Sequence, residues 1–140
     1  MICFEDVLLN TKAIDNGAWV ALGPEYGGLR IRTRGMSTPA YIEARAAHVA
    51  LLARKHGGER NVPRDEMDRL TADLLREHCW LEIDGMRKRD GSPVSLDEFH
   101  AAARERHGVS LLSAGIQAAI NVGTQQEEDL KAAEGNSAAP

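Results

Sequence analysis

The sequence predicts an α+β fold, a mostly α-helical single domain with a short N-terminal β-hairpin. Three observations support this prediction. Residues 18–34 hold two short β-prone stretches around a loop of turn residues. Four later stretches repeat apolar residues at helical spacing next to capping residues. After about residue 123 the chain becomes polar and alanine-rich. We therefore expect a domain over residues 1–123 and a flexible polar tail over 124–140.

The hairpin is predicted from side-chain alternation at about residues 18–34. In the second stretch Leu29, Ile31 and Thr33 share one face, and arginines occupy the other. The first stretch, residues 19–22, is short and β-prone, and the loop between them is rich in glycine. Because a lone hairpin is marginally stable in water, we expect it to pack on helices or on another subunit.

Four helices are expected, at about residues 39–56, 63–80, 96–107 and 111–122. Thr38 and Pro39 suit the start of the first helix, and Ser95 with Glu98 forms a capping box at the start of the third. Residues 79–85 are interpreted as the end of the second helix followed by a turn-rich crossing. The expected inward stripe of the first helix consists of Ile42, Ala46, Val49 and Ala53, widened by Leu52.

Composition is that of a soluble globular domain. The 140 residues are 43% hydrophobic and 27% charged, with a net charge of −4. Two cysteines, Cys3 and Cys79, do not make a disulfide framework, which favours a reducing compartment. No apolar run approaches the ~18 residues of a spanning helix, and the acidic start does not suit a signal peptide. We expect a protein of the cytoplasm that has no membrane association.

No catalytic, cofactor or metal site is expected. The five histidines form no pattern typical of zinc binding. His78 and Cys79 are adjacent, so on a helix they point in different directions and do not make a nucleophile–base pair. Cys79 is interpreted as a buried, inert thiol. The chain is therefore predicted not to be an enzyme.

Two basic features could contact nucleic acid. One is the arginine face of the hairpin, and the other is the run Arg87-Lys88-Arg89. The favoured interpretation of the first is the solvated side of a half-buried strand. The second supplies too few phosphate contacts for strong binding. Nucleic-acid binding is therefore kept only as an alternative, a small DNA- or RNA-binding regulator.

The order of short motifs over residues 17 to 122 resembles the tail assembly chaperones of long-tailed bacteriophages. The resemblance rests on a Trp-bearing strand, an R-x-R strand, a small-residue turn into a Tyr-bearing helix, a helix ending in Trp, and two Asp-Gly segments. In this chain they are residues 19–22, 30–32, 37–41, 74–80, 84–85 and 90–95.

The resemblance implies a non-enzymatic role in virion morphogenesis. Proteins of that group bind the long helical tape-measure protein in the host cytoplasm, recruit tail-tube subunits, often form homo-oligomers, and are absent from the finished particle. Many are also made in a longer form by ribosomal frameshifting, for which the tail over 124–140 would serve as a flexible link. A further alternative is a structural virion component, such as a head–tail completion protein.

Amphipathic helices can offer a groove to a partner helix. The candidate partner-binding residues are Trp80, Leu111, Leu112, Ile116 and Ile120. The alternative is that these side chains belong to the core of the domain.

Overall fold

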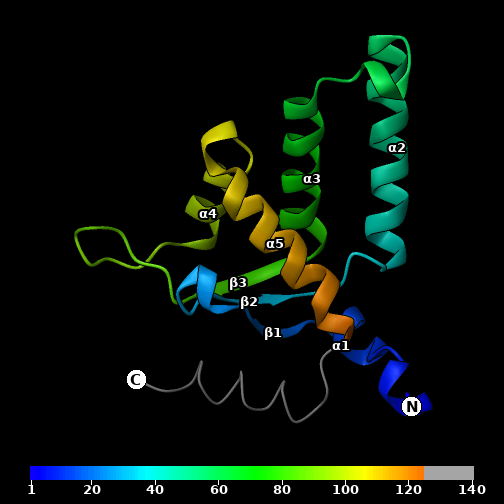
Figure 1. Cartoon of the computed structure of the whole chain (residues 1–140). Coiled ribbons are helices and arrows are strands. Elements are labelled where there is room, and N and C mark those ends of the chain that lie inside the picture. The colour runs from blue at the N-terminus through cyan, green and yellow to red at the C-terminus, as the bar shows by residue number, and fades with distance from the viewer. Residues whose placement is uncertain (125–140) are drawn as a thin grey trace.

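The computed structural model describes residues 1–124, which form five α-helices and one three-stranded antiparallel sheet in the order β1-β2-β3 (Figure 1). This confirms the predicted α+β, mostly helical class. The predicted tail falls, apart from Thr124, outside the described residues. The elements are α1 (Thr11–Asn16), β1 (Ala18–Ala21), β2 (Arg30–Thr33), α2 (Pro39–His56), α3 (Arg64–His78), β3 (Trp80–Asp84), α4 (Leu96–Ala103) and α5 (Val109–Asn121).

The hairpin gains a third strand that the sequence interpretation missed. Residues expected to be a helix end and a turn-rich crossing form β3, which pairs with β2 through Ile31↔Ile83 and Arg32↔Glu82. The helix stops at His78, and the β-prone residues that follow complete the backbone hydrogen bonds of β2. Gly85, with φ of +88°, ends the strand where a Cβ would lie 2.4 Å from the Gly28 carbonyl oxygen.

The end of α2 and the start of α4 show whether the caps expected from the sequence are formed. The first long helix, α2, has the predicted span, and Gly57 closes it in the left-handed conformation with its N–H bonded to the Ala53 carbonyl. The predicted capping box of Ser95 and Glu98 is present at the start of α4. That helix ends earlier than expected, at Ala103, and a short 3₁₀ turn (Arg106–Gly108) leads into α5.

The core lies between one face of the sheet and helices α3, α4 and α5 (Figure 1). Trp80 of β3 is at its centre, with its side chain 1% exposed and its ring edge-to-face with Phe99 at 5.3 Å. Its indole Nε1 donates a hydrogen bond to the Gly115 carbonyl oxygen of α5 at 3.2 Å. A Cβ at Gly115 would lie 2.1 Å from Trp80 Cζ2, so the close approach of α5 to the ring requires glycine.

The orientation of α2 differs from the expected one. Figure 1 shows α2 beyond α3, at the margin of the molecule. It faces α3 with Tyr41, which is buried, with Arg45, which donates to Thr71 Oγ1 at 2.8 Å, and with His56. Ile42 of the predicted inward stripe is instead 53% exposed, and Ala46 is exposed. The prediction of an inward-facing stripe was wrong because α2 covers only one neighbouring helix, and the apolar pattern does not say which face does so.

Candidate functional site

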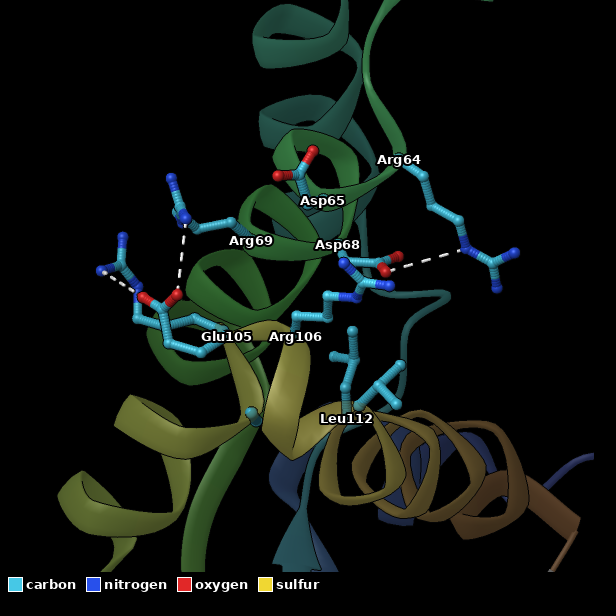
Figure 2. Close-up of a pocket in the computed structure, with 10 residues that line it drawn as sticks. Arg64, Asp65, Asp68, Arg69, Glu105, Arg106 and Leu112 are labelled. Carbon is cyan, nitrogen blue, oxygen red and sulfur yellow. Dashed lines mark hydrogen bonds and ion pairs between the residues drawn. The ribbon is translucent and has the colours of Figure 1, made fainter.

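A pocket of about 640 Å³ lies between the first half of α3 and the junction of α4 and α5 (Figure 2). The chain reaches this junction through Gly108, where a Cβ would lie 1.9 Å from the Ala102 carbonyl oxygen. The absence of a side chain there lets the 3₁₀ turn fold tightly against α4 and present α5 beside α3. The pocket is lined by Arg64, Asp65, Asp68, Arg69, Ala103, Arg104, Glu105, Arg106, Val109 and Leu112.

The rim of the pocket is charged and its base is apolar. Arg69 approaches Glu105 at 3.5 Å, and Arg64 approaches Asp68 at 3.9 Å. The Nε of Arg69 is buried without a hydrogen-bond partner in the described part of the chain. Leu112, almost fully buried, contributes to the apolar lining. An apolar side chain accompanied by a carboxylate would fit this arrangement, because Arg69 lines the pocket and its side chain is 43% exposed.

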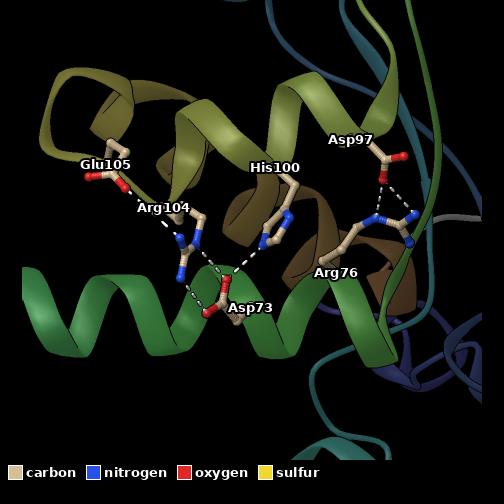
Figure 3. A network of polar contacts seen from close by, with 6 residues as sticks. All are labelled: Asp73, Arg76, Asp97, His100, Arg104 and Glu105. Atoms are coloured by element: carbon tan, nitrogen blue, oxygen red, sulfur yellow. Dashed lines mark hydrogen bonds and ion pairs between the residues drawn. The ribbon is translucent and has the colours of Figure 1, made fainter.

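A polar network joins α3 to α4 beside the pocket (Figure 3). Asp73 of α3 accepts hydrogen bonds from Arg104 Nε at 3.0 Å and Nη2 at 3.1 Å. His100 Nε2 lies 2.7 Å from the same carboxylate. One turn further along α3, Arg76 donates to Asp97 at 3.0 Å. These contacts fix the distance between the two helices that form the pocket walls.

The electrostatics of the network follow from this geometry. Burial alone would raise the pKa of Asp73, but the hydrogen bonds from Arg104 and His100 outweigh burial and hold that pKa below its ordinary value of 3.8. The hydrogen bond to Asp73 in turn raises the pKa of Arg104. The pairing stabilises the charged forms of both side chains, as expected for a structural bidentate ion pair.

The candidate partner-binding residues divide into core and surface. Trp80 and Leu112 are core residues, so neither offers free surface in the folded chain, although Leu112 also lines the pocket. Leu111 and Ile116 are half-buried and pack against the core. Ile120 near the end of α5 is 59% exposed. The structure therefore does not gather the five residues into one surface.

Sequence reasoning missed two apolar surfaces. Val109 at the start of α5 is 43% exposed and lines the pocket. The N-terminal segment, residues 1–9, exposes most of its large apolar side chains. The backbone N–H of Asn10 donates a hydrogen bond to the Gly123 carbonyl oxygen at 2.8 Å, and this bond holds the segment beside the end of α5. The dense apolar residues of this segment were a visible signal, but a short segment without clear periodicity does not indicate whether it is buried.

The thiol and the possible metal ligands singled out in the sequence can now be located in the fold. Cys79 is buried as predicted, and burial raises the pKa of its thiol to about 12. A thiol with that pKa is a poor nucleophile near neutral pH. Among residues 1–124, no three His, Cys, Asp or Glu side chains are grouped closely enough to hold a metal ion. Within the same range, no helix is both long enough and apolar enough to cross a bilayer.

Two of the three arginines on the exposed face of the hairpin, Arg30 and Arg32, are paired with acids. Arg32 donates to Glu82 at 3.0 Å, and Arg30 forms an ion pair with Asp84, both across β2 and β3. The Arg30 guanidinium also lies 6.0 Å from the ring centroid of Trp19. In the loop after β3, Lys88 pairs with Glu98. These pairings reduce the positive potential on which binding to phosphates depends.

Comparison of the chain with family models, with curated proteins and with solved structures finds no match.

Proposed function

We propose that this chain is a non-enzymatic tail assembly chaperone of a long-tailed bacteriophage. In this role it binds a segment of the tape-measure protein and recruits tail-tube subunits while the tail grows. The ordered series of short motifs between residues 17 and 122 supports the proposal.

The observation that carries the proposal is the pocket between α3 and the α4–α5 junction. Its lining joins apolar side chains of α5 to charged side chains of α3 and of the junction. Helix-in-groove recognition uses this combination, because an apolar anchor enters the groove while flanking charges set its orientation. We assign the anchor contact to Val109 and the carboxylate contact to Arg69, because both line the pocket and both side chains are partly exposed.

The genetic context gives the first test. The DNA that encodes the chain should be sequenced through and beyond its stop codon. The proposal expects a very long helical reading frame downstream, together with a slippery heptamer and an overlapping frame near the end of this one. Unrelated neighbouring frames, with no long helical product, would count against the proposal.

The second test is capture of that downstream helical product by the V109D variant. Asp at this position places a charge in the apolar part of the pocket, so we expect capture to fall at least about tenfold, equivalent to about 1.4 kcal/mol. Co-purification of the co-expressed pair, followed by titration, measures the loss. The helix itself tolerates the change, because an acidic residue in the first turn favours the helix dipole.

The S110D variant is the matched control. Ser110 is the next residue of the same first turn, is exposed, and is outside the pocket lining. Capture by S110D should equal capture by the wild-type chain. Equal losses in V109D and S110D would reject the pocket as the contact. Finding the chain in purified phage particles would instead indicate a structural virion component.

A further inference from the structure

The exposed face of α2 carries a regular apolar stripe. It consists of Ile42, Ala46, Val49, Ala50 and Ala53. At 3.6 residues per turn, the stripe lies about a quarter of a turn from the side that faces α3. Ile42, Ala46 and Ala50 are exposed, and Val49 and Ala53 are half-buried. Alanine suits any exposed helix, but β-branched Ile42 and Val49 lower helix propensity and so point to a packing role.

The charges beside the stripe indicate what covers it. Glu43 lies at the N-terminal end of the stripe and Arg54 at its C-terminal end, both exposed. They are eleven residues apart, or about three turns, so they share one edge of α2, the edge away from α3. At about 16 Å apart along the helix, they are too distant to pair within one chain. Neither side chain forms an ion pair within residues 1–124.

We propose that α2 pairs antiparallel with α2 of a second copy of this chain. The two copies are related by a two-fold axis perpendicular to α2, so every contact occurs twice. Glu43 meets the partner's Arg54, and Arg54 meets the partner's Glu43. The same axis sets Val49 close to the partner's Val49. Each Ile42 then packs near the partner's Ala53.

The rest of the geometry permits this pairing. The small side chains of Ala46 and Ala50 allow the two helices to approach within the 8–10 Å typical of packed helices. Figure 1 shows α2 at the margin of the molecule, with α3 on one side only. One helix of 18 residues, about 27 Å long, buries less surface than a permanent dimer needs. The dimer is therefore weak and depends on concentration.

The test is sedimentation equilibrium of the full chain over a hundredfold range of concentration. The average mass should rise from 15.3 kDa toward twice that value. The A46E variant should remain at the monomer mass, because a charge enters the centre of the stripe. The H48E variant is the control, since His48 is also exposed but lies more than a third of a turn from the centre of the stripe and from the edge that carries Glu43 and Arg54. A wild-type chain that stays monomeric, or equal behaviour of A46E and H48E, would overturn the proposal.

A charge-reversal cycle tests the antiparallel register separately. The single variants E43R and R54E should each weaken association about threefold to tenfold, because each places like charges together twice in the dimer. The double variant E43R/R54E should restore association by recreating both pairs in the opposite sense. Additive weakening in the double variant would refute this register. This cycle also decides the question if A46E fails to fold.

The dimer and the proposed function can fail independently. Capture of a helical partner depends on the pocket at Val109, whereas dimerisation depends on α2. A monomer that still captures the partner would remove only the dimer. A dimer that captures nothing would remove only the chaperone role.

Discussion

Two residues of the core, Trp80 and Gly115, depend on each other. The indole ring lies so close to α5 that a methyl group at position 115 has no room, and the indole N–H bonds to the backbone carbonyl of the same glycine. Glycine within a helix is normally unfavourable by about 1 kcal/mol relative to alanine. The cost is offset here by the burial of Trp80, the largest fully buried side chain among residues 1–124.

The G115A variant should therefore be less stable despite its higher helix propensity. Overpacking costs about 1–3 kcal/mol, and a Cβ 2.1 Å from a rigid ring places G115A in the upper part of that range, at about 2–3 kcal/mol. The propensity gain recovers about 1 kcal/mol of it. We expect a net loss of about 1–2 kcal/mol in the free energy of unfolding, measured by urea denaturation with circular dichroism. The exposed S113A variant on the same helix should stay within about 0.5 kcal/mol of the wild type. A G115A protein as stable as the wild type would contradict the close contact.

At the scale of elements, an ion-pair network connects α3 and α4. Its centre, Asp73, receives both the guanidinium of Arg104 and the imidazole of His100. The helices also meet through apolar contacts, including Leu75 and Phe99 in the shared core. The network therefore adds orientation to a contact that burial already stabilises.

Acid should remove the contribution of Asp73. Its folded pKa is lowered, so its stabilisation is present above the unfolded value of 3.8 and is lost as the pH falls through the folded pKa. After allowance for partial solvent exposure, we expect D73N to lose about 0.5–1 kcal/mol near neutral pH. The difference between wild type and D73N should vanish as the pH falls from about 4 toward 2, in urea unfolding at each pH.

The matched control for this prediction is D97N. Asp97 also pairs with an arginine of α3, but its side chain is 84% exposed. Its removal should change stability by less than that of Asp73. A D73N protein whose pH profile parallels that of the wild type would show that Asp73 carries no linked stability.

At the scale of the whole molecule, the sheet and helices α3 to α5 enclose one core, and Cys79 belongs to it. Its thiol is buried beside the Gly35 carbonyl oxygen at 3.5 Å, whereas Cys3 is exposed. Access to Cys79 therefore requires opening of the core.

The C3S variant tests whether the core is closed. Its remaining thiol, Cys79, should resist a thiol-specific chromogenic reagent in the native protein, because burial raises its pKa to about 12. The same thiol should react fully in denaturant, where it is no longer buried. Reaction of one thiol per chain in urea serves as the positive control. Equal reaction rates in native and denatured C3S would show that the core opens freely.

Several elements could be predicted from local sequence because their signals are local. The bounds of α2 follow from Pro39 at one end and Gly57 at the other. The start of α4 follows from the reciprocal bonds of Ser95 and Glu98, three residues apart. Caps of this kind need no distant partner, so a single sequence contains them.

The candidate site could be predicted only in part. Helix α5 was expected to be amphipathic, but whether Leu112 lines a pocket depends on α3, whose nearest pocket residue is more than forty positions away. Trp80 was a candidate partner contact, with a place in the core as the alternative, and the structure puts it at the centre of the core. A tryptophan before a polar turn suits either place, and only the position of Gly115 against its ring decides between them.

By itself, the sequence determined the α+β class, the hairpin, most helix bounds and the burial of Cys79, because periodicity and capping act over a few residues. Tertiary structure alone decided that residues 80–84 form β3, since a strand requires the free edge of β2 to complete its hydrogen bonds. It also decided which face of α2 packs on α3 and which stays exposed. Those outcomes depend on neighbours distant in the chain, and a local apolar pattern does not specify its neighbour.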